Sequence, residues 1–203
     1  MSQVCFDGQT VTPQKVVCVG KNYVAHIEEM GSVPAEDMVV FMKPTTSIGS
    51  TLASHAGETL HYEGEICLMM LGGKVAGVGF GLDLTKRETQ SKLKAAGLPW
   101  ERSKAFVGSA LFSDFVPAPD NLDQLGVELR INGEIRQKGD VSLMLYPPDV
   151  ILRELAQFQK LEDYDIVMTG TPAGVGPVEA GARFTGRVFD GDKELVCGEW
   201  VAE

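Results

Sequence analysis

The chain has 203 residues, of which 44% are hydrophobic and 23% charged, and its formal net charge at pH 7 is −10. This composition is ordinary for a globular protein and the length suits one hydrophobic core, so we expect a single domain over residues 1–203. The negative charge repels nucleic acid and anionic lipid, and the sequence holds no basic cluster with interleaved aromatic residues. We therefore expect neither a nucleic-acid partner nor a membrane partner.

The four cysteines, Cys5, Cys18, Cys67 and Cys197, are widely spaced and form no Cys-x-x-Cys pair. Buried free thiols in a reducing compartment are the expected state. Residues 1–10 do not resemble a signal peptide, and no apolar run reaches the length of a membrane span. We expect a cytoplasmic protein, with import into an organelle after removal of a presequence as the alternative.

A short helix is predicted over residues 23–30, after a buried strand. On this helix His26 and Glu29 are three residues apart and share a face, so Glu29 can orient the imidazole and raise its basicity. This is the arrangement of a general base with its orienting group, and the alternative is an exposed histidine beside solvated acids. Gly31 and Pro34 bound the segment and would let it move as a lid.

A second strand is predicted over residues 39–44. Pro44 ends its hydrogen-bond ladder, and Lys43 is expected at its mouth.

Three carboxylates are expected to converge around the next strand. Glu63 and Glu65 alternate at the start of an apolar run, so on an extended strand both point to one face, about 7 Å apart at the Cα atoms. Asp83 ends a second apolar stretch and can join them. Three acidic oxygens suit Mg²⁺ or Mn²⁺, and the alternative is the solvated face of a half-exposed strand.

Glycine alternates with larger residues over 75–83. The spacing is Gly-x-Gly-x-Gly within a strand, which differs from a dinucleotide-binding fingerprint and indicates closely packed backbone.

The sequence Thr85-Lys86-Arg87-Glu88 matches a capping box, so a helix is predicted from about residue 86 to Ala96, ending at Gly97. Arg87 and Gln90 lie one turn apart on it.

Three further elements are expected to form scaffold. The segment 127–137 predicts a hairpin with an Asn-Gly turn, and residues 148–160 predict a core helix followed by a strand over 161–168. The tail, residues 181–201, resembles one more hairpin. Between them, residues 169–177 are rich in turn-forming residues around two threonines, and either present N–H groups to an anion such as a carboxylate or form a tight surface turn.

Six motifs occur in a fixed order along the chain. They are Gly-x-Asn-Tyr-x-x-His-x-x-Glu at 20–29, Phe-x-Lys-Pro at 41–44, His-Tyr-Glu-x-Glu at 61–65, Leu-Asp-Leu-Thr-x-Arg at 82–87 with Gln90 and Lys104, Asn-Gly-Glu-x-x-Gln at 132–137 and Thr-Gly-Thr-Pro-x-Gly-Val-Gly at 169–176. Together they resemble the fumarylacetoacetate hydrolase family, most closely its short acylpyruvate hydrolase branch.

This resemblance implies an α+β fold, a mixed-sheet β-roll with flanking helices, and a homodimer. It also implies roles for individual residues: Mg²⁺ or Mn²⁺ on Glu63, Glu65 and Asp83; catalysis by His26, Glu29 and Lys104; and substrate binding by Lys43, Arg87, Gln90, Gly170 and Thr171. One departure is that the connection between Glu65 and Asp83 is shorter than is usual in the family.

Three functions fit this pattern. The first is metal-dependent hydrolysis of the C–C bond of β-diketo acids such as fumarylpyruvate or acetylpyruvate, in which a 2-oxo acid chelates the metal. The second is oxaloacetate decarboxylation or keto–enol tautomerisation at the same site. The third, prompted by the shortened connection, is a catalytically silent dimer that binds a metal and a small acid.

Overall fold

The computed structural model describes residues 2–31, 33 and 35–203. Helices are few and short: α1 (Val24–Glu29), α2 (Arg87–Ala95), α3 (Glu101–Lys104) and α4 (Pro148–Leu155), with 3-10 turns at Thr45–Ser47 and Val141–Leu143. No helix in this described part of the chain is long and apolar enough to cross a membrane.

A seven-stranded mixed sheet lies in the middle of the fold. Its order is β10-β7-β6-β13-β3-β4, with β9 also pairing with β7, and only the β13–β3 pair is parallel. The strands are β3 (Lys15–Gly20), β4 (Val39–Pro44), β6 (Gly64–Leu71), β7 (Lys74–Asp83), β9 (Ala110–Phe112), β10 (Val116–Pro117) and β13 (Ile166–Met168).

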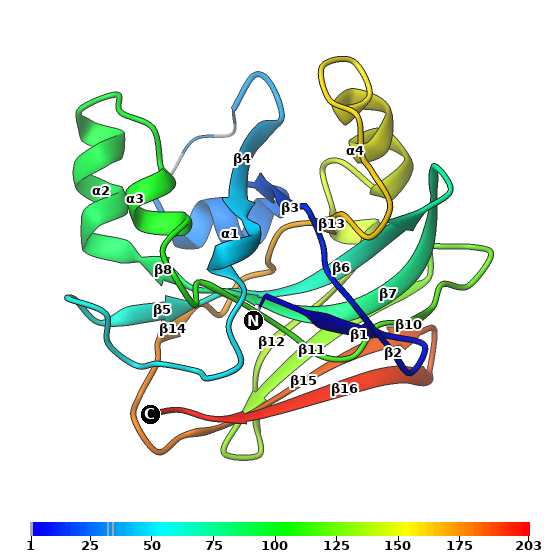
Figure 1. The fold of residues 1–203 in the computed structure, drawn as a ribbon. Helices are drawn as coiled ribbons and strands as arrows, with labels where there is room; N and C mark the ends of the chain where they lie inside the picture. Colours follow the sequence, from blue (N-terminus) through cyan, green and yellow to red (C-terminus); the bar gives the residue numbers. More distant parts are fainter. Residues whose placement is uncertain (1, 32, 34) are drawn as a thin grey trace.

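A second, four-stranded antiparallel sheet packs against one face of the first, opposite the helices (Figure 1). Its order is β12-β11-β15-β16, and its strands are β11 (Leu125–Ile131), β12 (Glu134–Asp140), β15 (Arg183–Asp190) and β16 (Lys193–Val201). Two small sheets complete the fold: β14-β5-β8, formed by β5 (Leu60–Tyr62), β8 (Thr85–Lys86) and β14 (Gly176–Pro177), and β1-β2, formed by β1 (Val4–Phe6) and β2 (Gln9–Val11).

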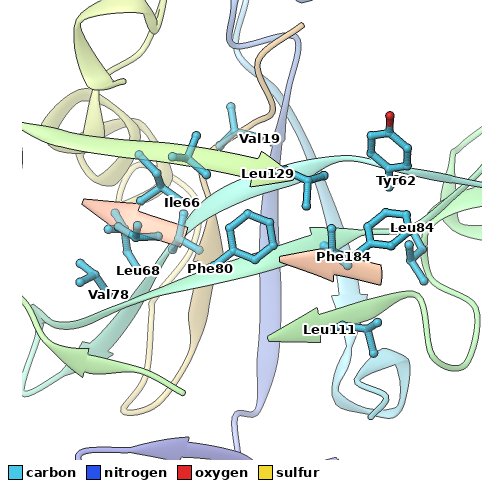
Figure 2. Packing of buried hydrophobic residues seen from close by; sticks show 14 of the residues in the cluster. Val19, Tyr62, Ile66, Leu68, Val78, Phe80, Leu84, Leu111, Leu129 and Phe184 are labelled. Carbon is cyan, nitrogen blue, oxygen red and sulfur yellow. The ribbon is translucent and has the colours of Figure 1, made fainter. Parts of the chain in front are cut away.

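The main hydrophobic core fills the space between the two large sheets (Figure 2). Because side chains alternate across a strand, one set of residues from β6 and β7 faces this core. Ile66, Leu68, Val78 and Phe80 are fully buried there, together with Phe184 from β15. The other face of β6 contributes Cys67 and Met69 to a second, smaller cluster on the side of the helices.

The large sheet is strongly curled. In a flat sheet β4 and β7 would lie about 19 Å apart, four strand spacings, and a lysine side chain covers only part of that distance. Nevertheless Nζ of Lys43 on β4 lies 2.9 Å from Oδ1 of Asp83 on β7. The curl confirms the predicted β-roll and brings side chains from distant strands to one point.

Most predicted elements are present, including both hairpins and the glycine-rich strand β7. The β7 glycines are closely packed as predicted, because a Cβ atom at Gly77 or Gly79 would lie within about 3 Å of a phenylalanine ring. Strands β6 and β7 pair continuously up to the turn at Leu71 and Lys74, apart from one β-bulge. The shortened connection is therefore a tight hairpin, and no strand is missing between them.

Three element predictions are wrong in detail. Helix α4 ends at Leu155 rather than near Lys160, and Phe158, expected in the core, is 63% exposed. The strand expected over 161–168 is reduced to β13, because the Asp165 carboxylate accepts the backbone N–H of Glu162 and makes a turn there.

The predicted capping box is also wrong. Thr85 belongs to strand β8, and its side chain makes no cap on helix α2. The carboxylate of Glu58, which is distant in sequence, accepts the N–H groups of Glu88 and Thr89 instead. The first turn of α2 is thus capped by a loop residue that the local sequence pattern does not reveal.

Candidate active site

Strand register explains why the three predicted carboxylates meet. In the β6–β7 ladder Glu65 pairs with Gly81, and the N–H of Asp83 bonds to the carbonyl of Glu63 at 2.8 Å. Residues two apart on a strand share a face, so Glu63, Glu65 and Asp83 all point to the concave side of the sheet. One ligand atom from each lies within 4.8 Å of the others, and all three residues are buried.

The carboxylates differ in their electrostatic environment. Burial opposes ionisation of Glu63, but Lys104 and Arg87 lie beside it and hold its pKa far below the usual range. Burial and the neighbouring Asp83 and Glu63 raise the pKa of Glu65 well above the usual range. The metal-free cluster therefore favours a protonated Glu65 next to an ionised Glu63.

Lys104 is a buried cation at the centre of the cluster, where the sequence alone gave no local signal for burial. Its Nζ donates to Glu63 Oε2 at 2.7 Å, to Asp83 Oδ2 at 2.6 Å and to the Thr85 hydroxyl at 2.6 Å. Burial would lower the pKa of Lys104, but Asp83 and Glu63 raise it above its usual value. The amine is therefore held as an ammonium ion.

Arg87 and Gln90 adopt the predicted geometry on helix α2. Arg87 Nη1 donates to Gln90 Oε1 at 2.8 Å, and Arg87 Nη2 donates to Glu63 Oε1 at 2.6 Å. Both side chains line the same pocket as the carboxylates.

Lys43 lies near the end of strand β4, as predicted, and its ammonium is beside the carboxylate cluster. Its side chain is fully buried, and its Nζ donates to the carbonyls of Lys104 and Ser109 and to the Ser109 hydroxyl. The ammonium also lies 2.9 Å from Asp83 Oδ1, without hydrogen-bond geometry. Lys43 is not among the residues that line the pocket.

The predicted His26–Glu29 pair is formed on helix α1. His26 Nδ1 lies 3.3 Å from Glu29 Oε2, and His26 is buried while lining the pocket. Among the residues that the structure describes, Nε2 of His26 has no hydrogen-bond partner. Glu29 also accepts the N–H of Gly174 at 3.0 Å, so helix α1 is fastened to the loop after β13. Pro34, one predicted boundary of the lid, lies outside the described residues.

The loop after β13 does present N–H groups to carboxylates, as one alternative predicted, but these carboxylates belong to the chain itself. Gly170 N–H donates to Glu65 Oε2 at 2.7 Å, and Gly174 N–H donates to Glu29. Thr171 donates its hydroxyl hydrogen to the Gly64 carbonyl at 2.9 Å. Thr171 lines the pocket, yet its hydroxyl hydrogen is already used within the protein.

Gln137 is a buried part of the site that the sequence interpretation treated as scaffold. Its Oε1 accepts the N–H of Gly64 at 2.8 Å, and its Nε2 donates to Thr171 Oγ1 and to the Pro172 carbonyl, both at 2.7 Å. The only signal in the sequence was its place in the Asn-Gly-Glu-x-x-Gln motif, since hairpin periodicity does not identify a long-range contact.

One pocket, with about 510 Å³ of empty volume including open solvent at its mouth, is lined by His26, Glu63, Glu65, Asp83, Arg87, Gln90, Lys104 and Thr171. A larger hollow over β11, β12 and β15 contains Glu128, but that carboxylate is paired with Arg130 at 2.6 Å. Three converging carboxylates, a buried ammonium and a histidine occur together in the first pocket, which we take as the candidate active site.

The carboxylate cluster fits a divalent cation. Its donors are hard oxygens, the kind that Mg²⁺ and Mn²⁺ prefer. Asp83 Oδ1 is buried and has no hydrogen-bond donor in the described part of the chain. The Lys43 ammonium lies 2.9 Å from this oxygen but makes no hydrogen bond with it, so the oxygen keeps acceptor capacity that a divalent cation can use.

Comparison with known proteins places the chain in a family. The model of the fumarylacetoacetate hydrolase C-terminal family matches residues 15–197. The chain is 38% identical over 196 residues to oxaloacetate tautomerase YcgM of Escherichia coli, covering 87% of this chain and 89% of the relative. It is 37% identical over 185 residues to a mitochondrial oxaloacetate tautomerase of Homo sapiens, covering 82% of this chain and 83% of the relative.

A solved structure shares the fold. The fumarylpyruvate hydrolase of Pseudomonas aeruginosa, solved in complex with Mn²⁺ and pyruvate, superposes with a TM-score of 0.85 and 31% sequence identity, covering 99% of this chain and 96% of that one. The matched motifs, the roll and these relatives agree, and the chain belongs to the fumarylacetoacetate hydrolase family.

Proposed function

We propose that this chain is a divalent-cation-dependent enzyme, one catalytic domain over residues 1–203, that interconverts the keto and enol forms of oxaloacetate. The observation that carries the proposal is the position of His26, which lines the same pocket as Glu63, Glu65 and Asp83 and is oriented by Glu29. The names of the two tautomerase relatives support oxaloacetate as the substrate.

Tautomerisation needs a group that moves a proton between the carbon next to the oxo group and solvent. His26 suits this role because Glu29 binds Nδ1 and leaves Nε2 toward the pocket. As His26 takes the carbon-bound proton, the C–H electron pair forms the C=C bond and the C=O π pair moves to oxygen, which takes a proton from solvent to give the enol; the same steps in reverse return the ketone. Glu29 stabilises the imidazolium that forms in between.

Lys104 is not the base in this account, because Asp83 and Glu63 raise its pKa and keep it charged. Its ammonium instead stabilises negative charge that develops on the substrate oxygen. Glu63, Glu65 and Asp83 would hold Mg²⁺ or Mn²⁺, and the cation when bound would supply Lewis acidity to the 2-oxo group.

Substrate-binding roles follow from the lining of the pocket. We assign binding of the substrate carboxylate to three residues that line the pocket: Arg87, Gln90 and, through its backbone, Thr171. Gly170 supports Glu65 instead of substrate, since its N–H is bound to that side chain. Lys43 positions Asp83 and the Lys104 backbone.

A second candidate is hydrolysis of the C–C bond of acylpyruvates. It is supported by the similarity to the fumarylpyruvate hydrolase and by the same His26–Glu29 pair, which can activate water as well as remove a carbon-bound proton. Decarboxylation of oxaloacetate is the variant that needs no attacking water. A silent binding protein is disfavoured, because binding alone does not require a base and its orienting group.

Product analysis separates these functions. Purified protein with Mg²⁺, or with a chelator, is incubated with oxaloacetate and with acetylpyruvate and followed by nuclear magnetic resonance. Faster keto–enol exchange of oxaloacetate without new products supports the tautomerase. Acetate and pyruvate from acetylpyruvate would support the hydrolase, and carbon dioxide with pyruvate from oxaloacetate would support the decarboxylase.

We also propose a homodimer, supported by the family motifs. Sedimentation should give a species of about twice the 21.9 kDa chain mass. A single species of one chain mass at micromolar concentration would refute it.

A further inference from the structure

The pocket has a cationic rim that the carboxylate cluster does not use. Lys21 and Lys94 both line the pocket, together with Glu63, Glu65 and Asp83. Lys21 follows strand β3, and Lys94 lies in the last turn of helix α2, so two separate elements bring positive charge to one place.

These two lysines differ from the other cations of the site. Arg87 and Lys104 are each paired with a carboxylate at 2.7 Å or less. Across the ranges 2–31, 33 and 35–203, no carboxylate lies within 4.0 Å of the ammonium of Lys94 or of Lys21. Lys21 donates to a neutral group, the carbonyl of Val33, at 3.0 Å.

The potential around Lys94 is correspondingly positive. Partial burial, Lys21 and Arg87 together lower the pKa of Lys94 below its usual value. An anion bound at this rim would relieve that repulsion.

An apolar wall holds Lys94 over the pocket. Its Nζ lies 5.7 Å from the centre of the Trp100 ring, and Trp100 packs against Phe41 at 5.8 Å between ring centres. Trp100, Phe41, Ile27 and Met30 line the pocket along with the charged groups. Cations occur at two places in the pocket, Arg87 and Lys104 at the cluster and Lys94 and Lys21 at the rim, and this distribution suits a ligand with two anionic ends.

We propose that Lys94, with Lys21 beside it, binds the second carboxylate of a dicarboxylic 2-oxo acid and so selects oxaloacetate-type substrates over monocarboxylic 2-oxo acids. This inference rests on the proposed function and deepens it. The first carboxylate and the oxo group occupy the cluster end of the pocket, and the second carboxylate pairs with the ammonium of Lys94.

Helix α2 provides a matched control. Lys92 and Lys94 both lie in its last turn, where a cation interacts favourably with the helix C-terminus. Lys92 is exposed and does not line the pocket. Lys92→Met therefore removes the same charge from the same turn without touching the rim.

The test compares wild-type protein, Lys94→Met, Lys94→Arg and Lys92→Met with Mg²⁺ present. Exchange of the C3 protons of oxaloacetate and of 2-oxobutanoate with deuterium is followed by nuclear magnetic resonance, which reports enolisation of both acids in one way. Lys94→Met should raise KM for oxaloacetate about tenfold with little change in kcat, the loss of roughly one charge-assisted contact. In the same variant, KM and kcat for 2-oxobutanoate should change less than about twofold. Lys94→Arg should restore most of the affinity for oxaloacetate that Lys94→Met loses. Lys92→Met should behave as wild type.

An equal loss for both acids in Lys94→Met, or no loss for oxaloacetate, would overturn the inference. Binding of the two acids to the same variants, measured by calorimetry, tests the inference independently of catalysis. If wild-type protein exchanges no protons, the proposed function is refuted. The inference is then decided by calorimetry: it holds if Lys94→Met weakens binding of oxaloacetate but not of 2-oxobutanoate, and it is overturned otherwise.

Discussion

Gln137 accepts the backbone N–H of Gly64 at 2.8 Å, and Gly64 is the residue between the two carboxylates Glu63 and Glu65. The carbonyl of the same residue accepts the hydroxyl of Thr171, whose oxygen in turn accepts a hydrogen from Gln137. One buried amide thus holds both sides of the segment that aims the two carboxylates. The two large sheets meet at this point, since Gln137 belongs to β12 and Gly64 to β6.

Gln137→Met should weaken binding of Mn²⁺ by about tenfold or more, because methionine fills a similar volume but cannot hold Gly64 and Thr171. Calorimetric titration with Mn²⁺ measures the change. Gln157→Met, at an exposed position in the turn after α4, is the control. Unchanged Mn²⁺ affinity in Gln137→Met, with a lowered melting temperature, would restrict Gln137 to a structural role.

Glu65 makes cation binding depend on pH. Burial, Asp83 and Glu63 raise its pKa, so the metal-free fold is most favoured while Glu65 is protonated. This contribution is lost as pH rises from the ordinary carboxyl range towards the raised pKa, and a cation gains an ionised ligand over the same interval. Mn²⁺ should therefore raise Tm more at about pH 8 than at about pH 5.

Glu65→Gln is the matched variant for that measurement. A neutral amide is a poorer ligand for a hard cation, so Mn²⁺ affinity should fall sharply and the pH dependence of the Tm shift should weaken. An equal Tm shift at both pH values in wild-type protein would contradict the account, and unchanged affinity in the variant would remove Glu65 from the ligand set.

Packing between the sheets depends on a glycine in β15. A Cβ atom at Gly186 would lie 2.1 Å from the fully buried ring of Phe80. Gly186→Ala should therefore lower the free energy of unfolding by about 1–3 kcal/mol, measured by urea denaturation. Gly126→Ala on the adjacent strand β11 meets its nearest atom at 3.5 Å and should change stability by less than about 1 kcal/mol in either direction. Similar effects of the two substitutions would show that the sheets can move apart.

Local patterns predicted the strands and the short helix α1 because alternation and helical spacing act over a few residues. The convergence of Glu63 and Glu65 followed from strand periodicity alone. The position of Asp83 beside these two carboxylates depends on the β6–β7 register, which is set by the hairpin turn at Gly72 and Gly73.

Long-range contacts could not be predicted in this way. The sequence around Lys104 does not indicate that its ammonium is buried between Glu63 and Asp83, because that environment arises when helix α3, which carries Lys104, packs against β4 and β8. The Glu58 cap on α2 likewise joins residues 30 positions apart, and the Gln137 contact with Gly64 joins residues 73 positions apart. Motif resemblance pointed to these regions without giving the contacts.

The most direct test of the central claim is the rate at which enol oxaloacetate is converted to the keto form with Mg²⁺, compared between wild-type protein and His26→Ala. The account predicts that wild-type protein accelerates the conversion and that His26→Ala lowers kcat by about 10²- to 10⁴-fold, the usual contribution of a general base, while Mn²⁺ affinity is unchanged. Glu29→Gln should cost less, because it removes only the group that orients His26. A His26→Ala protein that converts the enol as fast as wild type, with Mn²⁺ still bound, would contradict the assignment of the base and with it the proposed chemistry.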